Sequence, residues 1–185
     1  PQRRGPAHTE ARASAPIDVV DSHMHFHDAK CQKISWLSGK EKELKLEAGS
    51  FAREWSEDDL RKEIEATCAG RYNVKRGIFV EVAVDPSTHV SEAKMALKKA
   101  QDADSFIEGV VAAIPVPEGG AAVRGFLDKL RVNGELPKAL KGGRIVLFGA
   151  EKDVMLSQKY TSGLEELQKH GLLWEWCGTP DYLPG

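Results

Sequence analysis

The chain has 185 residues, of which 41% are hydrophobic, and its formal net charge at pH 7 is -2. This length allows one domain with its own core. Basic and acidic residues are interspersed, which argues against a nucleic-acid surface, and no run nears the ~20 apolar residues that span a membrane. The cysteines Cys31, Cys68 and Cys177 lack paired spacing, so we expect free thiols and a reducing, cytoplasmic location.

The first 16 residues are rich in proline, alanine and arginine and lack the apolar segment of a secretory signal. We expect residues 1–16 to be a disordered leader. Because no later stretch has the composition of a linker, we expect residues 17–185 to form one domain.

The first predicted strand lies in the segment IDVVDSHMHFH, residues 17–27, where a short apolar run gives way to alternating polar residues. Side chains of an extended strand alternate between its two faces. One face therefore collects an acidic residue and three histidines: Asp21, His23, His25 and His27. Two imidazoles at i and i+2 at the end of a buried strand make half of a metal site, because neutral imidazole is the commonest protein metal ligand.

The rest of the chain alternates helical periodicity with short apolar strands. We predict helices at 56–70, 88–100, 123–134 and 160–170, and strands at 77–84, 107–114, 144–148 and 172–177. Ser56 followed by three acidic residues predicts the first of these helix starts. Strands that alternate with helices indicate an α/β fold with a parallel sheet.

Two α/β architectures fit this alternation. One is an open doubly wound sheet, which binds ligands where the strand order reverses. The other is part of a (β/α)8 barrel, whose sites lie at the carboxyl ends of the strands. The first strand is not followed by a glycine-rich phosphate loop, and the polar residues lie at strand ends. These features favour the barrel.

The segment IDVVDSHMHFHDA resembles the first strand of the amidohydrolase superfamily, where H-x-H ends strand one. More narrowly, it is similar to the amidohydrolase-related, metal-dependent hydrolases of TIM-barrel fold, in the branch of sugar-lactone and pyrone-dicarboxylate lactonases. Five further segments agree in order over residues 17–177: WL, FVEVAVDP, GVVAAIP, LKGGRIVLFG and GLLWEW. The resemblance implies an incomplete TIM-barrel-type (β/α) repeat of about five parallel strands, truncated before strands six to eight.

The activity that the resemblance implies is hydrolysis of a lactone or a related cyclic ester or amide by water. It implies a divalent metal, zinc by preference, with His23 and His25 as ligands, or the same histidines polarising the substrate without metal. Bound metal can lower the pKa of water to about 7. Family members take their general base from strand eight, so we expect this chain alone to have little activity, and the catalytic residues stay unassigned.

Glu81 interrupts an otherwise apolar predicted strand. A buried carboxylate is unfavourable unless it is paired, so Glu81 is expected either to contact the substrate or to form an ion pair with Arg144, and Glu175 is interpreted in the same way. Arg144 itself is placed at the start of its strand, on the barrel face opposite the usual site.

His27 is the second candidate for substrate binding, because it shares the face of the histidine pair but lies where the strand turns into a loop. Asp21 is expected to orient a histidine or to bond local backbone. His89 is expected to be an exposed residue in the first turn of a helix.

The expected partner is a small-molecule substrate, without nucleic acid or membrane. A second hypothesis is a non-catalytic, self-associating module that pairs through the open apolar edges of strands one and five. A third, an open α/β ligand-binding domain, would show a reversal of strand order.

Overall fold

The computed structural model describes residues 15–28, 30–50, 53–68 and 70–180. Apart from residues 15 and 16, the predicted leader therefore lies outside the described residues. The strands are β1 Ile17–Met24, β2 Tyr72–Val80, β3 Ile107–Ala112, β4 Leu140–Val146 and β5 Leu173–Cys177. The helices are α1 Ser35–Glu43, α2 Glu57–Cys68, α3 His89–Lys99, α4 Gly120–Asp128 and α5 Gln158–Lys169. Short 3₁₀ turns lie at η1 Pro86–Thr88, η2 Val116–Glu118 and η3 Lys152–Leu156.

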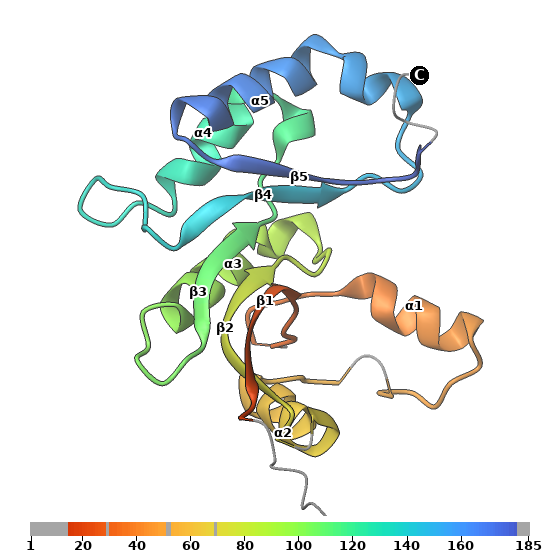
Figure 1. The fold of residues 1–185 in the computed structure, drawn as a ribbon. Helices are drawn as coiled ribbons and strands as arrows, with labels where there is room; N and C mark the ends of the chain where they lie inside the picture. The colour runs from red at the N-terminus through yellow and green to blue at the C-terminus, as the bar shows by residue number, and fades with distance from the viewer. Residues whose placement is uncertain (1–14, 29, 51–52, 69, 181–185) are drawn as a thin grey trace, which may run out of the picture.

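The five strands form one parallel sheet in the order β1-β2-β3-β4-β5. Neighbours in the sheet are neighbours in the chain, so the described strands show no reversal of order. The sheet curls, with α4 and α5 packed together over β4 and β5 (Figure 1). The prediction of an incomplete TIM-barrel-type α/β fold is confirmed, and the doubly wound alternative is wrong.

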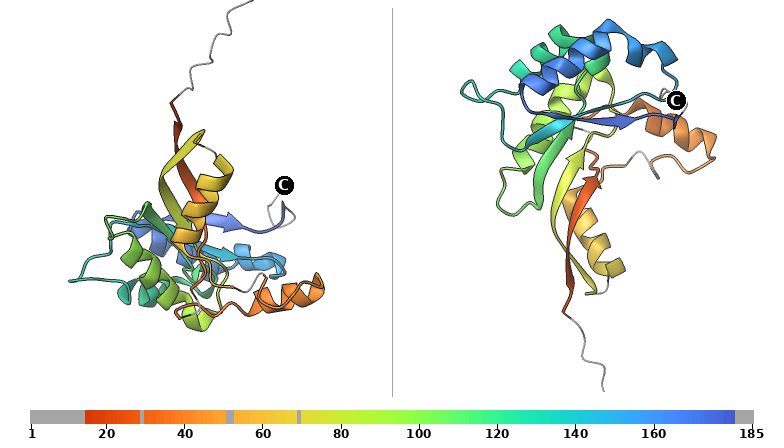
Figure 2. Two further views of the ribbon diagram at one scale, coloured as in Figure 1. Left: turned by 90° about the horizontal axis from the view of Figure 1, so that it is seen from below. Right: turned by 45° about the horizontal axis from the view of Figure 1, so that its top comes forward.

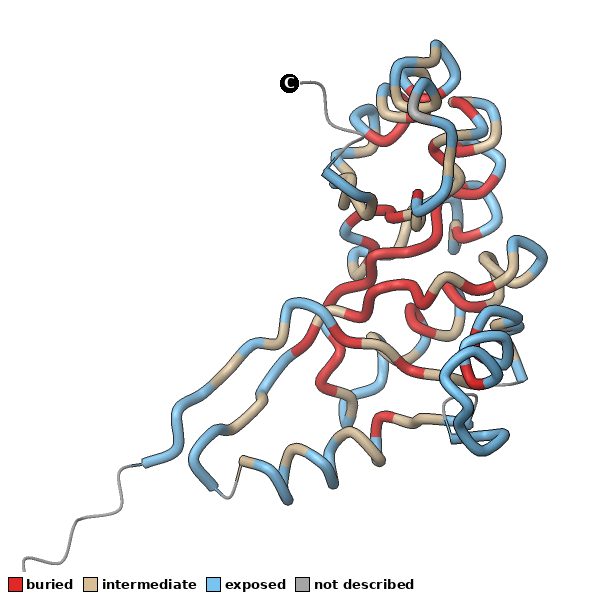
Figure 3. The backbone as a smooth tube through the Cα atoms, turned by 90° about the vertical axis from the view of Figure 1, so that its right-hand side faces the viewer, coloured by how far each residue is buried: buried red, intermediate tan, exposed pale blue. Residues whose placement is uncertain are grey.

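The core lies between the sheet and its helices. Apolar residues that recur at helical spacing in the third helical segment are buried: Val123, Phe126, Leu127 and Leu130. Figure 3 shows the buried backbone concentrated in the middle of the molecule, while the first residues of β1 are mostly exposed. Burial of one such large apolar side chain stabilises a fold by roughly 1.5–3 kcal/mol.

The helix start predicted at Ser56 is confirmed by its hydrogen bonds. The Asp59 amide donates to Ser56 Oγ at 3.2 Å, and Asp59 Oδ2 accepts from the Ser56 amide at 3.0 Å. This reciprocal pair satisfies amides that the helix cannot satisfy itself. The predicted start of the next strand is wrong by several residues: β2 begins at Tyr72 and pairs with Ile17 of β1, forming an arm that extends from the body of the molecule (Figure 2).

The predicted bounds of the fourth strand are also wrong, with a consequence for the site. β4 contains Gly142 and Gly143 in its interior, so Arg144 is the fifth of its seven residues rather than its first. A Cβ on Gly142 would lie 2.4 Å from the Leu173 carbonyl oxygen, and one on Gly143 would lie 2.7 Å from the Ile114 Cβ. Both positions need glycine because other segments of the same chain approach too closely to leave room for a side chain. Arg144 therefore lies towards the carboxyl end of β4, and its predicted placement on the opposite face is wrong.

Within the described residues, no helix has the length and hydropathy to cross a membrane.

Candidate functional site

The two histidines of the H-x-H motif lie at the end of β1. His23 is in the strand and His25 follows it, with Met24 between them buried on the other face. The His25 Nδ1 lies 2.8 Å from the Val80 carbonyl oxygen, so Nδ1 carries the proton and donates it, and Nε2 keeps its lone pair. Burial lowers the pKa of His25 below 6.5, which favours the neutral ring at pH 7. The two rings stand edge to face, with centroids 4.9 Å apart.

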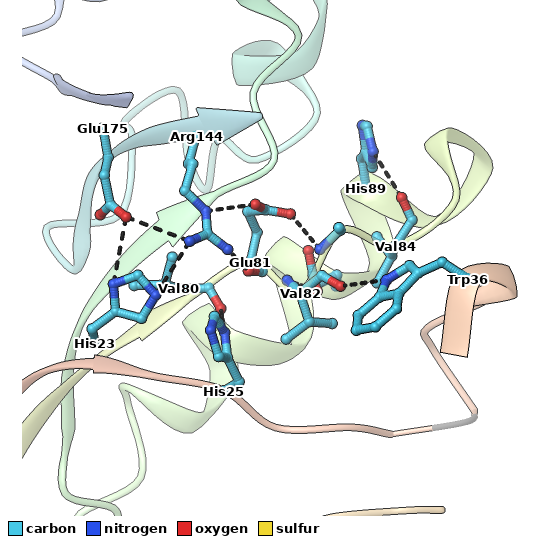
Figure 4. Close-up of polar contacts among 12 residues, drawn as sticks. His23, His25, Trp36, Val80, Glu81, Val82, Val84, His89, Arg144 and Glu175 are labelled. Atoms are coloured by element: carbon cyan, nitrogen blue, oxygen red, sulfur yellow. Dashed lines mark hydrogen bonds and ion pairs between the residues drawn. The ribbon is translucent and has the colours of Figure 1, made fainter. Parts of the chain in front are cut away.

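Arg144 is the centre of the cluster drawn in Figure 4. Its Nε donates to Glu81 Oε1 at 2.7 Å, and its Nη2 donates to the Glu81 carbonyl oxygen at 2.6 Å. Both side chains are buried, with residue exposures of 7% for Arg144 and 1% for Glu81. The ion pair with Arg144, one of the two expectations for Glu81, is therefore present, and each charge has the partner that burial requires.

His23 lies between opposite charges. Arg144 Nη1 is 3.2 Å from His23 Nε2, and Glu175 Oε1 is 3.5 Å from His23 Nδ1 (Figure 4). Because a guanidinium only donates, His23 Nε2 accepts, and Nδ1 carries the proton that faces Glu175. The side chains of His23 and Glu175 are 45% and 35% exposed. The cluster thus opens to solvent on this side and is closed around Glu81.

The loop after β2 holds the Glu81 carboxylate through a strained residue, Ala83. Ala83 has a φ of +52°, a left-handed conformation that is unfavourable for residues with a Cβ, and its amide donates to Glu81 Oε2 at 2.6 Å. The loop is tied to α1, because the Trp36 indole N–H donates to the Val82 carbonyl at 3.2 Å (Figure 4). Ser35 Oγ adds a hydrogen bond to Asp85 Oδ2 at 2.7 Å, and the hydrogen bonds from Ser35 lower the pKa of Asp85.

The other predicted site residues lie elsewhere or have local partners. The His27 amide pairs with the Trp55 carbonyl at 2.9 Å, and its ring borders a cavity of about 110 Å³ with Arg53. Burial lowers the pKa of His27. Asp21 Oδ1 accepts from the His23 amide at 3.0 Å, which is the backbone alternative expected for it.

His89 does begin a helix, but the expectation that it is exposed is wrong. Its ring is half-buried, with Nε2 3.2 Å from the Val84 carbonyl oxygen. It also borders a cavity of about 660 Å³ that is lined on β4 by Ile145. Ile145 follows Arg144 and faces the opposite side of the strand, so this cavity is separate from the cluster around Arg144.

We tested whether the donors of the cluster suit a metal ion. Among the described residues, no three His, Cys, Asp or Glu side chains gather closely enough to hold one. The His23 Nε2 faces a guanidinium, whose positive charge opposes a second cation at the same nitrogen. In this arrangement the His23 Nε2 is occupied by Arg144, and the zinc expectation stays a prediction.

The comparisons with known proteins agree with the fold. No sequence family profile matches the chain, and no curated protein matches it in sequence. Among solved structures, the chain is similar to an amidohydrolase 2 from Bifidobacterium longum subsp. infantis, with a TM-score of 0.58 and 23% identity. The match covers 89% of this chain and 53% of that protein, so the chain spans about half of its neighbour's length. The fold and this comparison define the class of the chain as an incomplete TIM-barrel-type α/β fold, similar in structure to part of that protein.

The sequence analysis named Arg144 as a possible partner of Glu81 but misplaced it, because it began the fourth strand at Arg144 rather than at Leu140. The available signal was the alternation of Gly142, Arg144 and Val146 on one face of a longer strand.

Proposed function

We propose that this chain is a hydrolase of the amidohydrolase type that acts on a lactone or a related cyclic ester or amide. The observation that carries the proposal is the hydrogen bond from His25 Nδ1 to the Val80 carbonyl. It leaves Nε2 of a neutral imidazole free to accept a proton, at the carboxyl end of a barrel strand, where barrel enzymes have their sites.

The proposed reaction is the attack of one water molecule on the substrate carbonyl. His25 Nε2 accepts a proton from the water as the new C–O bond forms. The oxyanion that develops on the carbonyl oxygen is stabilised by the positive charge of Arg144. The protonated His25 then donates its proton to the leaving ring oxygen or nitrogen as that bond breaks, which yields a hydroxy acid or an amino acid.

Besides stabilising the oxyanion, Arg144 positions His23 in this proposal, and Glu175 shares that positioning role. The Arg144 Nη1–H fixes the tautomer of His23, so that His23 presents an N–H towards Glu175 rather than a second base. Glu81 holds the guanidinium in place through its carboxylate and its carbonyl. The motif thus provides one base, His25, beside one oriented donor, His23.

Zinc assistance through His23 and His25 remains the alternative form of the proposal. In this form, the metal ion replaces Arg144 as the partner of the His23 Nε2. Metal analysis of the purified chain after zinc loading and gel filtration tests it. If this alternative holds, we expect about one zinc ion per chain and the loss of that ion in His23→Ala. A low zinc content that is the same in both proteins contradicts it.

Hydrolysis of dihydrocoumarin, an aromatic lactone, tests the proposed function on the full chain. We expect slow turnover above the spontaneous rate, in keeping with the little activity expected of this chain alone, and a fall to the spontaneous rate in His25→Ala. The matched control is His170→Ala, because His170 ends α5 and pairs with Glu166 at 3.7 Å. Equal rates for His25→Ala and the unaltered chain would overturn the proposal.

Three expectations remain predictions beside this proposal: substrate contact by Glu81 and His27, self-association, and a cytoplasmic location. Self-association would use the outer strands of the sheet, β1 and β5. Measurement of the mass in solution tests it, with a monomer at all concentrations as the contradicting result.

A further inference from the structure

Glu92 is a buried acid whose role neither the fold nor the proposed reaction explains. It lies in the first turn of α3 and is 0% exposed. Its Oε1 accepts hydrogen bonds from the Gln32 side-chain amide at 2.9 Å and from the Val82 backbone amide at 3.2 Å. Its Oε2 has no hydrogen-bond partner among the described residues. An unsatisfied buried oxygen is unfavourable and needs a reason.

The two donors, Gln32 and Val82, connect Glu92 to the two segments that carry the candidate site. Gln32 Nε2 also donates to the carbonyl of Phe26, the residue after His25, at 3.0 Å. Val82 follows Glu81, and Figure 4 shows the two side by side. A single carboxyl oxygen therefore joins the extension of β1 that carries His25 to the loop after β2 that carries Glu81.

We propose that Glu92 is a positioning residue of the candidate site, which holds the ends of β1 and β2 together through Oε1 and keeps a proton on Oε2. Its effect on catalysis rests on the proposed function above. Its structural role does not, because that role concerns only the spacing of the two chain segments.

The charges around Glu92 explain why the neutral acid is the stable form. Burial raises the pKa of Glu92 to about 7, and the negative charge of Glu81 acts in the same direction. Arg144 and the two hydrogen bonds oppose this shift. On the segment after β1, burial raises the pKa of the Cys31 thiol to about 11, so this thiol adds no charge near neutral pH. A buried hydroxyl without a partner is far less unfavourable than a buried charged oxygen without one.

The test compares the full-length variants Glu92→Gln and Glu92→Ala by amide hydrogen exchange. The reporter is the Val82 amide, which bonds Glu92, and the reference is the Val110 amide of β3, which donates to the Ala139 carbonyl at 2.8 Å. In Glu92→Ala we expect exchange at Val82 to accelerate at least tenfold relative to Val110. In Glu92→Gln the side-chain amide oxygen replaces Oε1 as the acceptor. We therefore expect the ratio of Val82 to Val110 exchange to be the same as in the unaltered chain.

Glu57→Gln is the matched control. Glu57 is also a buried glutamate in the first turn of a helix, and it also accepts from a backbone amide, that of Phe106 at 2.9 Å. We expect this variant to leave the ratio of Val82 to Val110 exchange unchanged, because a general loss of stability accelerates both amides together.

Each outcome decides the proposal. An unchanged ratio in Glu92→Ala overturns the positioning role. Acceleration in Glu92→Gln equal to that in Glu92→Ala overturns the neutral acid, since glutamine then fails to replace it. If Glu92→Ala does not fold, the pH dependence of unfolding in Glu92→Gln decides: we expect the unaltered chain to lose stability relative to this variant between pH 4.5 and 7, and a constant difference overturns the proposal. Failure to hydrolyse dihydrocoumarin with these results intact counts only against the proposed function.

Discussion

Two buried glutamates in the first turns of two helices have opposite surroundings. Glu57 of α2 lies at the amino end of β3, where it bonds the Phe106 amide and pairs with Arg61 at 2.6 Å. Glu92 of α3 lies beneath the carboxyl end of β2, bonds two neutral amides and has the like charge of Glu81 nearby. Among the described residues, the first acid has a cation in contact and the second has none.

The difference between the surroundings of Glu57 and Glu92 agrees with the different roles of the two ends of a barrel. Residues at the amino ends of the strands serve stability, and residues at the carboxyl ends serve chemistry. Acids without a neutralising partner are typical of functional sites, because their environment shifts their protonation. We therefore interpret the end with Glu57 as structural support and the end with Glu92 as the functional end. Four variants test this comparison.

The largest expected effect is at the functional end, where Glu81 and Arg144 form the buried pair. Glu81→Ala leaves Arg144 buried without its carboxylate, and we expect the free energy of unfolding to fall by about 3–5 kcal/mol. Urea unfolding at pH 7 measures it. The control is the double variant Glu81→Leu with Arg144→Met, which removes both charges and should recover most of the loss. A loss below about 1 kcal/mol in Glu81→Ala would contradict the importance of this pair.

The second effect is a pH dependence that originates at Glu92. Its pKa of about 7 in the folded chain is raised from 4.5, so the folded chain holds the proton more tightly than the unfolded chain. The contribution of Glu92 to the free energy of unfolding is complete below pH 4.5. It declines as the pH rises and is lost above about pH 7. At ~1.4 kcal/mol per pKa unit it amounts to about 3 kcal/mol.

The measurement is the difference in unfolding free energy between the unaltered chain and Glu92→Gln at several pH values, which cancels the titration of other groups. We expect the unaltered chain to lose stability relative to the variant as the pH rises from 4.5 to 7. A constant difference, or one that grows in the opposite direction, would count against a raised pKa at Glu92.

A somewhat smaller effect is expected at the structural end. Glu57→Gln removes the charge-assisted contacts with Arg61 and Lys99, and we expect a loss of about 1.5–3 kcal/mol. Urea unfolding at pH 7 measures it, and an unchanged free energy of unfolding in Glu57→Gln would contradict the supporting role of this end.

The smallest effect concerns the strained loop. Ala83→Gly relieves the left-handed backbone at φ +52°, but glycine also gains freedom in the unfolded chain, so we expect a net stabilisation below about 1 kcal/mol. The control Ala96→Gly lies in the buried interior of α3 and should destabilise by about 1 kcal/mol. Destabilisation by Ala83→Gly equal to that control would contradict the strain.

Much of the fold could be predicted because its signals are local. The alternation after Ile17 placed His23 and His25 together on one face, and the periodicity of Val123 and Phe126 predicted their burial. The register of β4 could not be predicted, because the reason for its two glycines is the approach of Leu173 and Ile114 from other segments.

The interactions of the site were hidden for the same reason. Arg144 is 63 residues from Glu81 and 121 residues from His23 in sequence, and Gln32 is 60 residues from Glu92. Such contacts are fixed by the curl of the sheet rather than by any local pattern. The sequence could suggest that Glu81 needs a partner, but only the fold brings Glu92 beneath the same loop.

The pH profile of dihydrocoumarin hydrolysis tests the central claim most directly, namely that His25 Nε2 is the base. Because burial lowers the pKa of His25, we expect the rate to rise with pH through an inflection below 6.5 and to stay level up to pH 8. In His25→Ala this inflection should disappear together with most of the rate. An inflection that persists unchanged in His25→Ala would contradict the account.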